Sequence, residues 1–194
     1  KSALVLRDLD ILARMAERNL AKVALSVTTL DATLVRKMEP RAATPMRRLE
    51  TLRRLAQAGV PTTVMVAPVI PALNDMEIER ILEAARTAGV KEAGYVLLRL
   101  PLEVRDLFRE WLIANYPDRY RHVFKLIRDM RGGKDYDSTW GTRMKGAGPY
   151  AWMIGRRFEM ACEKLGLNVS RTQLTIEHFR KPKPGTEQLS LFGS

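Results

Sequence analysis

Three short apolar segments that alternate with helical patterns constrain the fold of this chain most strongly. The apolar segments cover residues 22–28, 61–67 and 93–99, and the first of them is rich in β-branched residues. Segments of this length and composition are typical of buried strands. The residues between them, 45–58 and 75–88, repeat apolar side chains at helical spacing. This alternation predicts an α/β fold with a parallel sheet, right-handed crossovers and helices on both faces.

Local signals mark the ends of the predicted helices. Pro45 is typical of a first helical position, and Gly59 is typical of the position that follows a helix. Asn74 and Glu77 have the spacing of a capping box. A further helical pattern covers residues 8–19, before the first predicted strand.

The pattern changes after Pro101. Helical spacing covers residues 102–115, resumes at Pro117 and stops at two glycines, after which a glycine-rich loop leads to a helix over 149–165. The last stretch is rich in Lys, Pro, Thr and Ser, which predicts an extended tail. We therefore expect three parts, namely strand–helix units over residues 1–100, a helical extension over 101–167 and a basic tail over 168–194.

The charge balance favours a polyanionic partner. The formal net charge is +11, and such an excess of cations raises the local concentration of nucleic acid. A basic surface that has no nucleic-acid partner is the alternative interpretation of the charge.

Composition also excludes several classes of protein. The single cysteine, Cys162, excludes an internal disulfide framework and a metal site built from cysteines alone. No apolar run is long enough to span a bilayer and no signal peptide opens the chain, so we expect no membrane partner and a cytoplasmic location. The chain begins with Lys1 rather than Met, and we expect further sequence to precede it.

Candidate binding residues follow the predicted strands, because parallel α/β folds bind ligands at the carboxyl ends of their strands. Ser26 places a hydroxyl inside an apolar strand, and it is either a core serine or a ligand contact. The segment 67–71 carries two prolines and predicts a stiff wall whose backbone groups can contact a flat ring. The long connection 29–44 carries Glu39 and Arg41, which either contact a ligand or are solvated.

An ordered series of residues resembles the radical S-adenosylmethionine enzymes. The series consists of Lys1-Ser2, Arg7-Asp8, the strand 23–27, Glu39-Pro40, Ala58-Gly59 and the stretch 66–75. Within these enzymes it is most similar to the spore photoproduct lyase-related branch, also called DNA repair photolyase-like. The resemblance covers residues 1–100, and residues 101–166 resemble the C-terminal helical region of one bacterial subgroup.

This resemblance implies the C-terminal half of a partial (β/α)6 barrel of the TIM type, with parallel strands and a C-terminal helical extension. It also implies S-adenosylmethionine and a [4Fe-4S] cluster that three cysteines near the start of the barrel hold. Those cysteines are absent here, and Cys162 cannot replace them because the cluster needs three thiolates in one loop. We therefore expect the cluster ligands upstream, no metal ligand in this chain, and no activity from this chain alone.

The resemblance also assigns cofactor contacts. It implies that Lys1 pairs with the cofactor's carboxylate, that Ser26 contacts its methionine or ribose part, and that Ala67 and Val69 bind adenine through the backbone. In the intact enzyme the cofactor is expected to yield a 5′-deoxyadenosyl radical that abstracts hydrogen from a substrate. The resemblance implies a lyase-like enzyme that acts on nucleic acid in DNA repair. No catalytic residue is identified.

The glycine-rich loop contains the candidates for substrate contact. It combines flexible glycines with cations and aromatic rings that suit phosphates and bases, and the candidates are Lys134, Tyr136, Trp140 and Arg143, with Arg41 from the earlier loop. A structured loop packed under the barrel is the alternative.

The tail ends in a peptide that resembles the sliding-clamp-binding motif of bacterial replication and repair proteins. Its anchors are Gln188, Leu189, Leu191 and Phe192, which follow a tether rich in Pro and Lys. A glutamine amide and closely spaced apolar side chains suit a pocket on a partner. An apolar end that packs on its own domain is the alternative.

Two other functions stay open from the sequence. One is a module without catalysis that binds DNA or the clamp, and the other is a radical enzyme that acts on a protein or a small molecule. A three-stranded parallel sheet also exposes its edges, so we expect another copy of the chain, or upstream strands, to cover them.

Overall fold

The computed structural model describes residues 1–181. Its elements follow in the order η1 (Ala3–Asp8), α1 (Leu9–Ala16), β1 (Val23–Ser26), α2 (Ala32–Met38), α3 (Pro45–Gln57), β2 (Thr62–Val69), η2 (Asp75–Glu77), α4 (Ile78–Thr87), β3 (Glu92–Leu97), α5 (Val104–Asn115), α6 (Pro117–Asp129) and α7 (Gly148–Leu165). The alternation of strands and helices up to β3 confirms the predicted α/β class.

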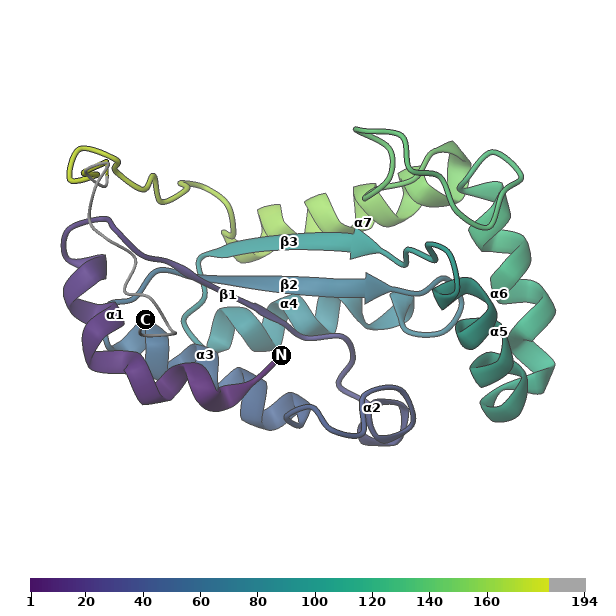
Figure 1. Cartoon of the computed structure of the whole chain (residues 1–194), viewed down its shortest axis with the longest axis horizontal. Coiled ribbons are helices and arrows are strands. Elements are labelled where there is room, and N and C mark those ends of the chain that lie inside the picture. Colours follow the sequence, from purple (N-terminus) through teal and green to yellow (C-terminus); the bar gives the residue numbers. More distant parts are fainter. Residues whose placement is uncertain (182–194) are drawn as a thin grey trace, which may run out of the picture.

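The three strands form one parallel sheet in the order β1-β2-β3. Ser26 pairs with Met65 across β1 and β2, and Val66 pairs with Tyr95 across β2 and β3. Because all strands run in the same direction, their carboxyl ends lie at one edge, where the arrowheads point in Figure 1. We call this edge the carboxyl edge. A sheet of three parallel strands with helices is compatible with part of a TIM-type barrel.

Helices cover one face of this sheet. Helices α3, α4 and α7 lie on the same side of the strands in Figure 1, and strand side chains such as Leu25 and Val64 pack in a core with them. On the other face Ala24 is exposed, while Ser26 and Met65 are only half-buried. The prediction of helices on both faces is therefore wrong for the described residues. We call this second face the open face.

The last helix, α7, belongs to the main core of the sheet. Its residues Ile154, Phe158 and Cys162 pack in the same cluster as the strands, and the ring centroid of Phe158 lies 4.8 Å from that of Tyr95 on β3. An amphipathic stripe at helical spacing explains this placement. The part predicted as a helical extension over 101–167 is thus packed partly against the sheet.

The helices α2, α5 and α6 gather around the carboxyl edge. Leu34 of α2, Leu112 of α5 and Phe124 of α6 share a second apolar cluster with Ile70 and Leu100, which follow β2 and β3. The sequence predicted α5 and α6 but treated the whole of residues 29–44 as a loop. Asp31 begins α2 by accepting hydrogen bonds from the backbone N–H groups of Thr33 and Leu34.

The predicted helix ends have mixed outcomes. Pro45 is confirmed at the first position of α3, and Gly59 follows that helix with a φ of 77°, a conformation that favours glycine. The predicted capping box is wrong, because the Asn74 side chain makes no cap hydrogen bond to the helix that follows it. Its amide is used at the carboxyl edge instead.

No helix among residues 1–181 is both long and apolar enough to cross a membrane. Residues 168–181 contain no helix or strand. The predicted clamp-binding residues Gln188, Leu189, Leu191 and Phe192 lie outside the described residues.

Candidate functional site at the carboxyl edge

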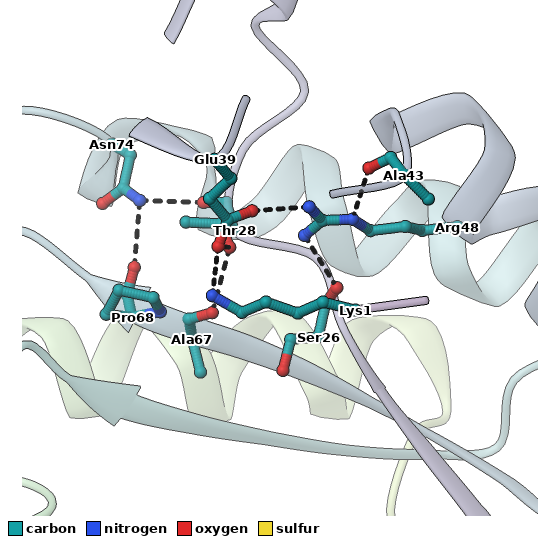
Figure 2. A network of polar contacts seen from close by, with 9 residues as sticks. All are labelled: Lys1, Ser26, Thr28, Glu39, Ala43, Arg48, Ala67, Pro68 and Asn74. Atoms are coloured by element: carbon teal, nitrogen blue, oxygen red, sulfur yellow. Dashed lines mark hydrogen bonds and ion pairs between the residues drawn. The ribbon is translucent and has the colours of Figure 1, made fainter. Parts of the chain in front are cut away.

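Glu39 is the centre of a polar network at the carboxyl end of β1 (Figure 2). Its Oε2 atom accepts a hydrogen bond of 2.5 Å from Nη2 of Arg48, and its Oε1 atom forms an ion pair with Nζ of Lys1. The Thr28 hydroxyl lies 3.2 Å from the same Oε1 atom. One carboxylate thus joins the start of the chain, the end of β1 and helix α3.

Arg48 holds this network from inside the protein. It lies in the first turn of α3 and is only 1% exposed. Its Nε atom donates to the Ala43 carbonyl at 2.7 Å and its Nη1 atom donates to the Ser26 carbonyl at 3.2 Å. A buried guanidinium is tolerated when a carboxylate and further acceptors satisfy it, and Glu39, Ala43 and Ser26 meet that need here.

Asn74 fixes the turn that follows β2. Its Nδ2 atom donates to the carbonyls of Thr28 at 2.8 Å and Pro68 at 3.0 Å, and its Oδ1 atom accepts from the Ile70 N–H at 2.6 Å. The peptide bond between Ala67 and Pro68 is cis. The Thr28 hydroxyl also lies 3.1 Å from the Ala67 carbonyl, so the ends of β1 and β2 are held together.

The charge of Glu39 depends on its two cations. Burial by itself would raise the pKa of this carboxyl group, but hydrogen bonds and charges from Lys1 and Arg48 hold the pKa below its ordinary value of 4.5. Glu39 is therefore ionised at neutral pH, and its ion pair holds the Lys1 ammonium in the network.

Glu39→Gln is expected to make the free energy of unfolding depend less on pH in the acid range. Because the pKa of Glu39 in the folded state lies below 4.5, its stabilising contribution is present above that pH and is lost as the pH falls through the folded pKa. Urea unfolding between about pH 3 and 6 measures this dependence. Glu50→Gln, which changes a more exposed carboxylate on α3, is the control. A Glu39→Gln profile parallel to that of the wild type would contradict this electrostatic account.

The structure brings three of the four predicted cofactor contacts together. Lys1, Ser26 and Ala67 all join the network of Glu39, Thr28 and Arg48, and the Ser26 side chain points away from that network in Figure 2. Within the described residues, the Ser26 hydroxyl has no hydrogen-bond partner. Val69 lies apart from them, because its side chain is 1% exposed in the core and its carbonyl accepts a hydrogen bond from the Leu98 N–H.

The predicted substrate residues lie in two places. Arg41 is exposed between α2 and α3, and Lys134 is exposed after α6. Trp140 is 81% exposed, and the guanidinium carbon of Arg143 lies 4.2 Å from its ring centroid. Tyr136 instead accepts a hydrogen bond from Nη2 of Arg99 at 3.0 Å. Four of the candidates thus belong to one loop, and Arg41 belongs to another.

Sequence reasoning did not assign Thr28, Arg48 and Asn74 to the site. Arg48 carried a detectable signal, because it falls at helical spacing with Pro45, Leu52 and Leu55, all of which are buried. An arginine within a buried stripe needs an acidic partner, and Glu39 is the acid of the preceding loop. Asn74 carried the wrong signal, since its spacing to Glu77 also fits a helix cap.

The described residues do not fit an iron–sulfur cluster. No group of three His, Cys, Asp or Glu side chains among residues 1–181 is placed to hold a metal ion. Cys162 is buried in α7, and burial, followed by the charges of Glu159 and Glu163, raises its pKa to about 11. Its thiol stays protonated at neutral pH, whereas a cluster ligand must be a thiolate.

Comparison with known proteins relates this site to one superfamily. Residues 2–85 match the Radical SAM superfamily, and this stretch contains β1, β2 and all of the network except Lys1. An uncharacterized protein of Mycobacterium tuberculosis is 32% identical over 130 residues, which are 64% of this chain and 38% of that protein. No solved structure matches the chain.

Two further relatives come from outside the bacteria. An uncharacterized protein of Acidianus two-tailed virus is 38% identical over 97 residues, which are 47% of this chain and 32% of that protein. An uncharacterized protein of Methanocaldococcus jannaschii is 28% identical over 123 residues, 63% of this chain and 44% of that protein. The chain thus spans less than half the length of these relatives. The carboxyl ends of β1 and β2, where Glu39 and Arg48 meet, lie within the stretch that matches the Radical SAM superfamily.

Proposed function

We propose that this chain supplies S-adenosylmethionine contacts of a radical SAM enzyme. The observation that carries the proposal is the Ser26 hydroxyl, which lies on the open face at the carboxyl edge and has no hydrogen-bond partner among the described residues. A polar group in this position suits a ligand that binds across the ends of parallel strands. The match of residues 2–85 to the superfamily supports the same conclusion.

In this proposal each side chain has a defined task. The Ser26 hydroxyl binds the ribose or methionine part of the cofactor, and the backbone at Ala67 lies along the adenine. The Lys1 ammonium, which Glu39 already orients, pairs with the cofactor's carboxylate. Arg48 and Asn74 are positioning residues, since they hold Glu39, Thr28 and the Ala67–Pro68 segment near the end of β2. The cofactor supplies a carbon-centred radical for hydrogen abstraction.

The described residues do not supply ligands for an iron–sulfur cluster. The superfamily in general uses a [4Fe-4S] cluster with S-adenosylmethionine, whereas residues 1–181 offer no ligand set for it. In the proposed enzyme the cluster cysteines are therefore supplied from elsewhere, and the described part of this chain contributes binding and orientation of the cofactor.

The substrate part of the proposal is nucleic acid, in the spore photoproduct lyase-related branch. The net charge of +11 and the exposed Trp140, stacked with the Arg143 guanidinium, support it. Aromatic faces flanked by cations suit stacked bases and phosphates. Docking of the tail on a sliding clamp belongs to the same proposal, through Gln188, Leu189, Leu191 and Phe192.

Ser26→Ala is expected to weaken the binding of S-adenosylmethionine by roughly ten-fold, because it removes one hydrogen bond to the ligand. Isothermal titration of the 194-residue chain with S-adenosylmethionine measures this. Thr63→Val is the matched control, since Thr63 lies on the same open face nearer the amino ends of the strands. The proposal fails if the chain shows no saturable binding, or if both variants bind as the wild type does.

A further inference from the structure

Two arginines meet at the carboxyl end of β3 without an acidic partner. Arg99 follows that strand, and Arg131, which is 4% exposed, donates to the carbonyls of Leu98 at 3.1 Å and Thr142 at 3.0 Å. Arg99 donates from Nη2 to the Tyr136 hydroxyl at 3.0 Å, and its Nη1 lies 3.9 Å from Sδ of Met144. All these acceptors are neutral.

Arg99 also has an unused donor. Its Nε atom is buried and has no hydrogen-bond partner among the described residues. Burying a guanidinium without a counter-charge costs several kcal/mol in proteins, so the pair requires an anion more than most surface arginines do. Burial lowers the pKa of Arg131, a shift that the charge of Asp137 opposes and the charge of Arg99 increases.

The acids of this loop are already engaged. Asp135 forms an ion pair with Arg128 at 2.6 Å, and Asp137 accepts hydrogen bonds from the Thr139 and Thr142 hydroxyls. Around them are five cations for which the described residues provide no ion pair, namely Arg99, Arg131, Lys134, Arg143 and Lys145. The end of β3 therefore carries more positive than negative charge, although the carboxylate of Asp137 lies close enough to act on Arg131 and Lys134.

We propose that Arg99, held by Tyr136 and supported by Arg131, binds a phosphate group of the substrate. A planar guanidinium fork matches the oxygens of a phosphate, and the exposed Trp140 on the same loop offers a face for an attached base. This inference rests on the proposed function, because it names the chemistry by which a nucleic-acid strand is recognised. A free nucleotide or inorganic phosphate has the same chemistry.

The position of Arg99 fits that task. It follows β3 and Ser26 ends β1, while β2 lies between these strands in the sheet. Both residues are at the carboxyl edge. A nucleic-acid strand whose phosphate is bound at Arg99 would therefore lie beside the proposed cofactor. The sequence showed Arg99 at the end of a predicted strand but gave no sign of its unused donor.

The test measures two phosphate-bearing probes with the 194-residue chain. Fluorescence anisotropy follows a labelled oligothymidine at several salt concentrations, and calorimetry follows inorganic pyrophosphate. Arg99→Gln is expected to weaken both by roughly ten-fold and to lower the salt slope for the oligonucleotide by about 0.7. Arg99→Lys, which keeps the charge and loses the fork, is expected to preserve the slope but not the full affinity.

Arg86→Gln is the matched control. Arg86 is an exposed arginine at the end of α4, near the amino ends of the strands, and its loss is expected to change neither probe by more than about two-fold. Equal binding by the Arg99→Gln and Arg86→Gln variants overturns the phosphate site while leaving nucleic-acid binding in place. Loss of affinity in Arg99→Gln without a change of salt slope also overturns it.

The two probes separate this inference from the proposed function. If pyrophosphate binding depends on Arg99 and the oligonucleotide does not bind, the phosphate site is supported. Nucleic acid is then excluded as the molecule that carries the bound phosphate. A wild-type chain that binds neither probe overturns the phosphate site, whereas the cofactor site is judged by the Ser26→Ala titration.

Discussion

Arg48→Met is expected to lower the free energy of unfolding by about 3 kcal/mol, because removing one partner of a buried ion pair leaves the other charge uncompensated. Glu39 would keep only Lys1 as a cation, and the Ala43 and Ser26 carbonyls would each lose a donor. Methionine keeps a long apolar side chain in the space of the arginine, so the change reports mainly on charge and hydrogen bonds. Urea unfolding at neutral pH measures the difference.

A neighbouring arginine and a double variant make this prediction specific. Arg47→Met removes an exposed guanidinium from the same turn of α3 and is expected to change stability by less than about 0.5 kcal/mol. Glu39→Gln combined with Arg48→Met is expected to be less destabilising than the sum of the two single changes. In the double variant both charges of the buried pair are gone, so neither is left without its partner. Additive effects would show that Arg48 and Glu39 are not coupled.

Asn74→Ala is expected to lower the free energy of unfolding by at least about 2 kcal/mol. The side chain is 2% exposed and makes three hydrogen bonds to backbone groups at the carboxyl ends of β1 and β2. Each buried backbone group that loses its partner costs about 1 kcal/mol or more. The same change is expected to weaken binding of S-adenosylmethionine, since the Ala67–Pro68 segment of β2 loses its support.

Asn115→Ala is the matched control for this second variant. The Asn115 amide donates one hydrogen bond of 2.9 Å to the Trp111 carbonyl within α5, so its loss is expected to cost less than about 1 kcal/mol. Thermal unfolding followed by circular dichroism ranks the two variants. Equal stability of the Asn74→Ala and Asn115→Ala proteins would contradict the role assigned to Asn74.

The strands and most helices of this protein could be predicted from local patterns. Short apolar runs became β1, β2 and β3, and the helix that Pro45 begins and Gly59 follows was found nearly to the residue. These elements follow from spacing and backbone chemistry, which lie within a short stretch of sequence. Helix α2 was missed because only seven residues form it, which is too few for a helical repeat to stand out.

The site could be predicted only in part. Ser26 and Ala67 stood out as polar or constrained positions at strand ends, and the structure places them together with Lys1. The contacts of Arg48, Glu39 and Asn74 join residues far apart in the chain, and Asn74 fitted a local helix cap equally well. Which faces of the sheet are covered is also a property of the packed chain, and no single segment carries that information.

The central claim is that S-adenosylmethionine binds at the carboxyl edge of this sheet. Backbone amide chemical shifts of the chain, recorded by NMR during a titration with S-adenosylmethionine, test it most directly. The account predicts saturable shifts at Ser26, Thr28 and Ala67, with Thr62 and Glu92 at the opposite edge unchanged. Shifts that do not saturate, or shifts concentrated at Thr62 and Glu92, would contradict it.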